Sequence, residues 1–347
     1  MITGIAVKNQ TKNAPSPHKT PWQQALAQAI RDPQTLLDAL ELPHTVPVST
    51  TAAQQFRVLA PWSYVQRMHK GDPNDPLLRQ VLPHPDEMQE VTGYLSDPVD
   101  DQAAMTVPGV LHKYHGRVLL VTTGACAIHC RYCFRRHFPY NEANPLRHHS
   151  QMALDYIRAD SSIQEVILSG GDPLTLSDER LAQLADALST IPHVQRLRIH
   201  SRLPLVLPER VDHALLTWLS QLQSKLQVII VLHANHAQEL DASDVRQAMQ
   251  ALQQAGVLLL NQSVLLKGIN DSVDALCALS EALLAQHILP YYLHVLDKVA
   301  GAAHFDTPEQ QAITLIDGVR ARLPGYMVPQ LVREIAGETA KTPLPTI

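Results

Sequence analysis

Three of the four cysteines in this 347-residue chain lie within the eight-residue string CAIHCRYC. Cys126, Cys130 and Cys133 follow a C-x3-C-x2-C spacing, which places three thiolates on one loop. Such a trio can ligate three irons of a [4Fe–4S] cluster and leave the fourth iron open to a small molecule. The alternative is a zinc site completed by His129 or His137, although zinc sites more often pair two C-x2-C units.

Glycines and polar side chains gather where later apolar runs end. In SGGDPL, Gly170 and Gly171 let the backbone approach a ligand closely and precede Asp172, although such a string is more often a simple turn. Further polar groups end or lie within three other apolar runs, at residues 200–202, 233–236 and 261–263. Polar groups there cost burial energy unless something pairs with them, so the pattern indicates a polar cavity.

The elements that must position these residues form a regular series. Apolar, β-rich runs begin at Arg117, Gln164, Val194, Leu226, Val257 and Leu289, and after the first interval of 47 residues they recur every 30–32 residues. Helical patterns such as SDERLAQLADALSTI and TPEQQAITLIDGVRARL lie between them. A strand with its crossover helix takes roughly 30 residues, so one βα unit is repeated. We therefore expect an α/β fold, a partial (β/α)6 TIM-like barrel whose chemistry lies at the C-terminal ends of the strands.

The remaining segments divide the chain further. The polar, Pro-containing start predicts a flexible arm, and helical spacing interrupted near Pro33 predicts two short helices after it. The expected parts are an arm at 1–20, a helical region at 21–110, the barrel at 111–325 and a C-terminal segment at 326–347.

Composition limits the classes of function. The net charge is −5 and no Lys/Arg run tracks a phosphate backbone, so nucleic acid is not an expected partner. There is no uninterrupted apolar span of the roughly 18 residues that a membrane helix needs, and MITGIAVKNQTKN lacks a secretory apolar core. We expect a cytoplasmic protein whose crowded thiols bind metal, whereas Cys277, in an apolar helical pattern, is interpreted as a core residue.

The string CAIHCRYCFRRHF, following the first barrel strand, resembles the radical S-adenosylmethionine enzymes and in particular the lysine 2,3-aminomutase family. The resemblance runs from about residue 95 to the end of the chain. It implies a [4Fe–4S] cluster held by Cys126, Cys130 and Cys133, whose open iron binds S-adenosylmethionine and cleaves it to a 5′-deoxyadenosyl radical. The same resemblance assigns S-adenosylmethionine contacts to Gly170, Gly171, Asp172, Arg202, His233 and Gln262. Arg202 could equally be a structural ion-pair partner.

The family also carries pyridoxal 5′-phosphate, and its Schiff-base lysine corresponds to Lys341, in GETAKTP. A lysine near a proline is by default a solvated surface residue, but a desolvated primary amine suits this bond. By resemblance, Lys113, Tyr114 and Arg117 anchor the cofactor phosphate, a task that suits arginine with a neighbouring tyrosine hydroxyl. Each of the three, taken alone, is explained equally well as part of a solvated strand entrance.

Lysine has two charged ends to hold. The resemblance assigns its carboxylate to Arg135 and its side-chain ammonium to Asp297 and Glu334, the latter one methylene longer than the Asp of the fermentative members. An ammonium between two carboxylates disfavours glutamate as substrate, because unpaired charges would remain. The alternative for Asp297 is a solvent-exposed ion pair with the adjacent Lys298.

The implied activity is an isomerase that moves the α-amino group of L-lysine to the β-carbon. The chain runs only six residues past Lys341, like the short bacterial members that supply (R)-β-lysine for modification of elongation factor P. The implied partners are L-lysine, a reducing electron donor, a β-lysine ligase and elongation factor P, with a possible homo-oligomer. The alternatives are a fermentative or osmolyte lysine 2,3-aminomutase, a radical aminomutase for another amino acid, and a non-catalytic iron–sulfur or zinc protein.

Overall fold

The core of the protein is a curved sheet of parallel strands joined by helices. The computed structural model describes residues 19–140 and 150–345. The parallel strands are β3 (Arg117–Thr123), β4 (Glu165–Gly170), β5 (Arg196–Ser201), β6 (Gln227–Leu232), β7 (Leu258–Val264), β8 (Leu289–His294) and β9 (Gln330–Arg333). Their order in the sheet is their order along the chain, as in a barrel wound by successive crossovers.

The prediction of a partial barrel is confirmed, and its first six strands lie where the apolar runs placed them. The count of six is wrong in one detail, since β9 pairs in parallel with β8 and adds a seventh parallel strand. Its four residues, QLVR, are too few to give a recognisable periodic run, so its existence is set by pairing with β8.

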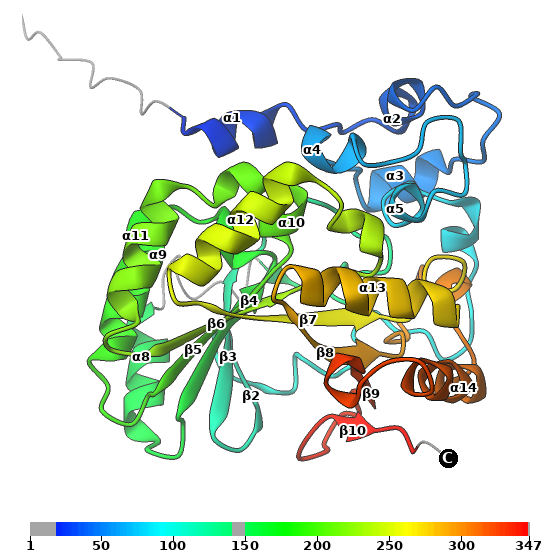
Figure 1. Ribbon diagram of the computed structural model, residues 1–347. Helices are drawn as coiled ribbons and strands as arrows, with labels where there is room; N and C mark the ends of the chain where they lie inside the picture. The colour runs from blue at the N-terminus through cyan, green and yellow to red at the C-terminus, as the bar shows by residue number, and fades with distance from the viewer. Residues whose placement is uncertain (1–18, 141–149, 346–347) are drawn as a thin grey trace, which may run out of the picture.

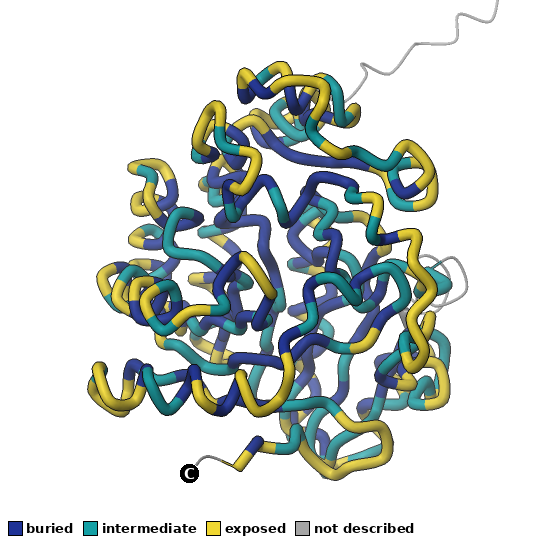
Figure 2. Tube along the Cα trace, turned by 90° about the vertical axis from the view of Figure 1, so that its right-hand side faces the viewer, coloured by how far each residue is buried: buried dark blue, intermediate teal, exposed yellow. Residues whose placement is uncertain are grey.

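Helices cover the outer side of the sheet, as Figure 1 shows. They are α8 (Ser150–Ala159), α9 (Asp178–Ser189), α11 (His213–Leu222), α12 (Ser243–Gln254), α13 (Val273–Ala285) and α14 (Glu309–Arg320). Their starts have local causes: Asp212 accepts a hydrogen bond from Leu215 N at 2.9 Å, and Ser272 accepts one from Ala275 N at 3.1 Å. Leu and Ile side chains of these helices pack on the strands. Figure 2 shows the buried residues of this interior in dark blue along the chain trace.

Antiparallel strands end the sheet on both sides. Before β3 come β1 (Met105–Val107) and β2 (Val110–Tyr114), and after β9 comes β10 (Thr342–Pro343). Strands β1 and β10 each have one neighbour among the described strands, so the barrel is open.

Short helices precede the sheet and lie together at one end of it, at the top of Figure 1. They are α1 (Pro21–Ala27), α2 (Pro33–Ala39), α3 (Thr50–Gln55), α4 (Trp62–Val65), α5 (Pro76–Arg79) and the 3-10 turn η1 (Pro85–Met88). The pair of helices predicted on either side of Pro33 is confirmed as α1 and α2. Other short elements are η2 (Pro173–Thr175), α10 (Leu203–Val206), η3 (Pro208–Arg210), η4 (Ala237–Glu239), η5 (Ala303–Phe305) and η6 (Gly325–Met327).

The flexible arm predicted for 1–20 falls, apart from its last two positions, outside the described residues. The other domain boundaries, at 110 and 325, stay predictions. Within the described ranges no helix has both the length and the apolar character to cross a bilayer.

Candidate active site

A cavity of about 290 Å³ opens at the C-terminal ends of the parallel strands. Seven strands contribute to its wall through residues that end or follow them. Every residue that the sequence assigned to the site lines this cavity: Lys113, Tyr114, Arg117, Cys126, Cys130, Cys133, Arg135, Gly170, Gly171, Asp172, Arg202, His233, Gln262, Asp297, Glu334 and Lys341. Residues up to 228 positions apart in sequence are therefore brought to one place, while their individual roles stay predictions.

The three cysteines of the loop after β3 are free thiols. Burial raises the pKa of Cys133 to about 11, and burial also raises that of Cys126, so as free thiols both are protonated at neutral pH. The fourth cysteine, Cys277, is 3% exposed and packs in the core beside α13, as predicted. Three thiols on one wall, without a fourth cysteine, are a donor set that fits a cluster with one open iron.

The zinc alternative lacks its fourth ligand in this geometry. His129 Nδ1 contacts the carbonyl oxygen of Arg57 at 2.7 Å, and His137 Nε2 contacts that of Ala300 at 3.2 Å. Neither ring lines the cavity. Across residues 19–140 and 150–345, no three Cys, His, Asp or Glu side chains converge as ligands of a single ion would.

The N-terminal helices hold the cysteine loop in place. Arg131, between two of the cysteines, is fully buried and donates to both carboxylate oxygens of Glu87, at 2.8 and 2.6 Å. Its backbone N–H donates to the Gln80 carbonyl at 2.9 Å, and His129 N donates to the Leu59 carbonyl at 3.0 Å. A bidentate buried pair fixes orientation as well as position. Glu87 was missed by the sequence analysis, because no motif marks it.

The glycine segment after β4 packs tightly on the start of the cysteine loop. A Cβ on Gly171 would lie 2.3 Å from the Ala125 carbonyl oxygen, and one on Gly170 would lie 2.7 Å from that of Thr123. The absence of side chains thus serves close backbone packing, in addition to any approach of a ligand. The Gly170 carbonyl already accepts from Tyr140 Oη at 2.9 Å.

The Asp172 carboxylate is occupied by protein donors. It accepts from Ser201 Oγ, Arg202 N, Leu203 N and Leu174 N, at 2.8, 2.9, 3.0 and 3.1 Å. A carboxylate offers about four acceptor positions, so none is left for a ligand unless one of these bonds breaks. The residue joins the end of β4 to the end of β5. Its backbone is also bonded, because its N–H donates to the Ala125 carbonyl at 2.7 Å and its carbonyl accepts from Thr175 N at 3.0 Å.

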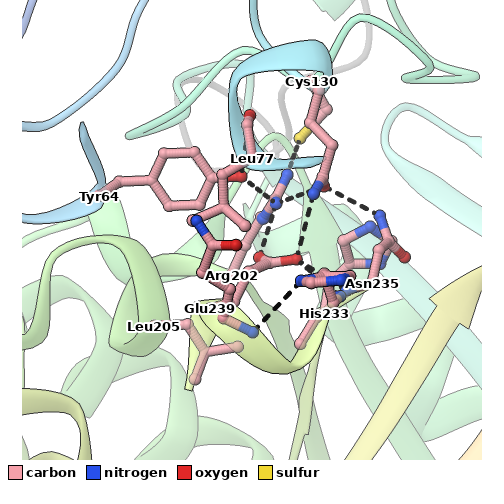
Figure 3. A network of polar contacts seen from close by, with 12 residues as sticks. Tyr64, Leu77, Cys130, Arg202, Leu205, His233, Asn235 and Glu239 are labelled. Atoms are coloured by element: carbon pink, nitrogen blue, oxygen red, sulfur yellow. Dashed lines mark hydrogen bonds and ion pairs between the residues drawn. The ribbon is translucent and has the colours of Figure 1, made fainter. Parts of the chain in front are cut away.

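Three further predicted residues line the same cavity: Arg202 directly follows β5, His233 directly follows β6, and Gln262 lies on β7. His233 Nε2 contacts Tyr132 Oη at 2.9 Å, and burial, together with the charge of Arg202, lowers the pKa of His233 to about 3, so its ring is neutral. Arg202 belongs to a buried polar network with Cys130 (Figure 3). The Gln262 side chain lines the cavity and makes no hydrogen bond to another described residue.

An alternating chain of charges crosses the opposite side of the cavity. Lys341 Nζ lies 2.5 Å from Glu334 Oε2, and Lys113 Nζ lies 2.9 Å from Glu334 Oε1. Lys113 also contacts Asp101 Oδ1 at 2.6 Å, while Asp101 Oδ2 accepts from Arg135 Nε at 2.7 Å. Burial would raise the pKa of Glu334, but Lys341 and Lys113 outweigh it and hold this pKa at about 2. Asp101, in an irregular stretch without motif, was not predicted.

The second predicted acid has the opposite environment. Asp297 follows β8 and its carboxylate makes no hydrogen bond or ion pair with another described residue, so the predicted alternative of a Lys298 pair is not formed. Burial, with the nearby charge of Glu334, raises the pKa of Asp297 to about 7. A buried carboxylate that lines the cavity without a cation among the described residues is a place where the cationic group of a ligand would be stabilised.

The cavity near Lys341 contains additional polar groups. Arg117 lies over the ring of Tyr114, 4.7 Å from its centre. His200 and His294 line the same wall, and burial lowers the pKa of both well below the usual value, so both are neutral. His200 Nε2 is buried without a partner among the described residues. His200 belongs to one of the polar strand ends that the sequence pattern marked. His294 ends β8 and was not predicted, because the tyrosines before it gave this segment the pattern of an ordinary strand.

Comparisons with known proteins cover nearly the whole chain. A family model described as the Radical SAM superfamily matches residues 120–279. The L-lysine 2,3-aminomutase of Escherichia coli is 47% identical over 336 residues, which are 96% of this chain and 96% of that protein. That of Haemophilus influenzae is 47% identical over 322 residues, with 92% and 94% coverage. That of Clostridium subterminale is 38% identical over 283 residues, with 81% and 67% coverage.

Proposed function

Since this chain belongs to the lysine 2,3-aminomutase family of radical S-adenosylmethionine enzymes, we propose that it moves the α-amino group of L-lysine to the β-carbon, giving β-lysine. The observation that carries the proposal is the single cavity that places the cysteine trio, Lys341 and the carboxylates of Asp297 and Glu334 around one space.

The first half of the cavity serves the cluster and S-adenosylmethionine. Cys126, Cys130 and Cys133 would ligate three irons of a cluster, which together with S-adenosylmethionine would supply radical chemistry at this end of the cavity. The side-chain amide of Gln262, which has no partner among the described residues, and the neutral ring of His233 face this ligand, next to the backbone of Gly170 and Gly171. Arg202 and Asp172 support the same wall mainly through protein contacts.

The second half serves pyridoxal phosphate and the substrate. Lys341 would hold the aldehyde cofactor, which when bound would supply electron delocalisation for the radical rearrangement. Tyr114 and Arg117 hold its phosphate, and Lys113 contributes charge from its position between Asp101 and Glu334. The cations fit a dianionic group, and Lys113 shares the carboxylate of Glu334 with Lys341.

The substrate is held at both ends. Arg135 orients the carboxylate of L-lysine, with its Nε fixed by Asp101 and its Nη1 by Ser169 Oγ at 3.1 Å. Asp297 receives the side-chain ammonium, and Glu334 completes the acidic pair. A neutral or acidic side chain would leave Asp297 uncompensated, so lysine is preferred over glutamate or another amino acid.

The reaction's place in the cell is a finer part of the proposal. We propose that the product is (R)-β-lysine, which a β-lysine ligase attaches to elongation factor P, that a cytoplasmic reductant supplies the electron, and that the enzyme works in the cytoplasm. These statements rest on the resemblance to the short bacterial members. Chiral chromatography of the product and a ligase assay with elongation factor P would test them.

The activity itself is tested by anaerobic incubation of the reconstituted enzyme with lysine, S-adenosylmethionine, pyridoxal phosphate and reductant. Chromatography should show β-lysine from the wild type and from Cys277→Ala, whose thiol packs outside the cavity. Cys130→Ala and Lys341→Ala should give none. A wild type that turns over a different amino acid in a substrate panel, but not lysine, would replace this function with the alternative aminomutase.

A further inference from the structure

A buried guanidinium lies directly against one of the three cysteines. Arg202 follows β5 and is 6% exposed. Its Nη1 donates to Cys130 Sγ at 2.7 Å (Figure 3). The same Nη1 donates to Tyr132 Oη at 2.9 Å. Cys126 and Cys133 accept no such bond from a described side chain, so the three thiols are not equivalent.

Residues from separate parts of the chain hold this guanidinium in place. Its Nη2 lies 2.7 Å from Glu239 Oε2, 2.7 Å from Gln80 Oε1 and 3.1 Å from Tyr64 Oη. Tyr64 and Gln80 come from the N-terminal helices, and Glu239 ends η4 after β6. Glu239 is itself fixed, because its Oε1 accepts from Asn235 N at 2.8 Å. The cation therefore has little freedom to turn away from the thiol.

The pair of charges is ionised inside the protein. Burial would raise the pKa of Glu239, but Arg202 and the backbone N–H of Asn235 outweigh it and hold the pKa below its usual value. A carboxylate with two buried donors and a guanidinium with several acceptors satisfy one another, which is the condition for burying such a pair.

We propose that Arg202 is a positioning residue for the iron–sulfur cluster. In this role Arg202 donates a hydrogen bond to the Cys130 thiolate and raises the reduction potential of the cluster. The inference rests on the proposed function, in which Cys130 ligates iron. Reduction adds negative charge to the cluster and its sulfurs, and a donor with a positive charge stabilises the reduced form more than the oxidised one. Of the five N–H groups of Arg202, only Nε–H is buried without a partner, so its other donors serve the protein rather than S-adenosylmethionine.

The test is an EPR-monitored redox titration of the reconstituted protein without S-adenosylmethionine or pyridoxal phosphate. Arg202→Gln should lower the midpoint potential, so that the ratio of reduced to oxidised cluster at a fixed potential falls about tenfold, or 59 mV for one electron. Arg202→Lys should give a smaller shift, because an ammonium keeps the charge but cannot reach all five acceptors. Glu239→Gln should shift the potential the other way, because it removes the negative charge that offsets Arg202.

A matched control is Arg210→Gln. Arg210 is also fully buried and paired, with Asp178 Oδ1 at 2.8 Å, but it does not line the cavity. We expect it to lower the melting temperature and leave the potential unchanged. If the substitutions acted only by loosening the folded structure, the midpoint potentials of the cluster in Arg202→Gln, Glu239→Gln and Arg210→Gln would all shift in the same direction.

Iron content and the wild-type spectrum separate the two ideas. A wild type without a reducible cluster would overturn the proposed function, whereas a wild-type cluster whose potential is unchanged in Arg202→Gln would overturn only the role of Arg202. If both Arg202 variants fail to hold four irons, ¹⁵N-arginine labelling of the wild type decides. With arginine labelled only in the guanidinium, so that the backbone nitrogens of Arg131 and Arg135 do not contribute, pulsed EPR of the reduced cluster should detect ¹⁵N coupling, and its absence would refute the contact.

Discussion

At the scale of single residues, two carboxylates in one cavity are held in opposite states. Glu334 is paired with two lysines and its pKa is about 2, whereas Asp297 has no partner in the described part of the chain and its pKa is about 7. A buried carboxylate without a neighbouring cation lowers the stability of the folded protein when it is ionised, and this cost disappears when it is protonated. Asp297 thus carries an energetic cost at neutral pH, which a ligand ammonium would remove.

We predict that Asp297→Asn raises stability while weakening the binding of lysine. The raised folded-state pKa of Asp297 means that its favourable contribution is complete below the unfolded value of 3.8 and is lost as the pH rises through about 7. Because Asn cannot ionise, the free energy of unfolding of Asp297→Asn should exceed that of the wild type by roughly 1–3 kcal/mol at pH 8. Calorimetry of the apoprotein should show a higher melting temperature than the wild type at pH 8 and a smaller difference at pH 5.

The pH dependence of lysine binding follows from the same carboxyl. In the wild type the KM for lysine should rise as the pH falls below about 7, because protonated Asp297 no longer attracts the ammonium. In Asp297→Asn the KM should be raised at every pH and lose this dependence. An unchanged KM in the variant would remove Asp297 from the substrate site.

The residues of the site divide by whether the sequence could reveal them. The cysteines are predictable from their spacing after a strand, whereas Lys341 and Asp297 are assigned by resemblance to the family, and their roles stay predictions. Asp101 and Glu239 are not predictable, because a carboxylate that pairs with an arginine far away in sequence has no local signature. Only the folded chain shows that Asp101 lines the cavity and that Glu239 lies behind it, paired with Arg202.

At the scale of elements, the N-terminal helices act as the foundation of the cysteine loop. Glu87, in η1, is 6% exposed and contacts Arg131 at 2.6 Å and Arg136 Nη2 at 2.9 Å, and both arginines flank the last cysteine. The sequence predicted helices here, but these are only four to seven residues long, and helices this short take their stability from packing. The sequence pattern therefore does not reveal that these helices support the cysteine loop.

We predict that Glu87→Gln loosens the cluster. Two buried guanidinium groups would lose their anion, a kind of change that costs about 3–5 kcal/mol. Iron release to a chelator should be faster than in the wild type, with a lower melting temperature. Asp38→Asn is the control, since it removes the exposed pair with His44 in the same region and such pairs contribute little. Equal iron release from both variants would show that the loop stands without Glu87.

At the scale of the whole molecule, side chains bridge the opening of the barrel. Lys113 on β2 and Glu334 after β9 belong to opposite ends of the sheet, yet they form an ion pair at 2.9 Å. Tyr94 Oη also donates to Asp306 Oδ2 at 2.7 Å, and Leu95 forms an isolated bridge with Val299. The cavity therefore lies at a seam, and the charges that line it also connect its two edges.

The segment between β9 and β10 is the part of this seam that a bound cofactor should affect most. Residues 335–340 are exposed, and the segment is held by short β10, by Leu344 N donating to Leu331 O at 3.1 Å, and by the Glu334 contact of Lys341. Few buried contacts mean a low free energy of local opening. A covalent bond from Lys341 to a group anchored in the cavity would tie the segment to the barrel.

We therefore predict that pyridoxal phosphate slows amide hydrogen exchange across residues 334–344 of the wild type by at least about tenfold, since a ligand at 10–100 times its Kd stabilises the closed form by more than about 1.4 kcal/mol. In Lys341→Ala this protection should disappear, while exchange in the remote helix α12 should be the same in both proteins. Mass spectrometry of peptic fragments measures each segment separately. Equal protection in Lys341→Ala would mean that the cofactor is not tethered here and that the seam closes by its ion pairs alone.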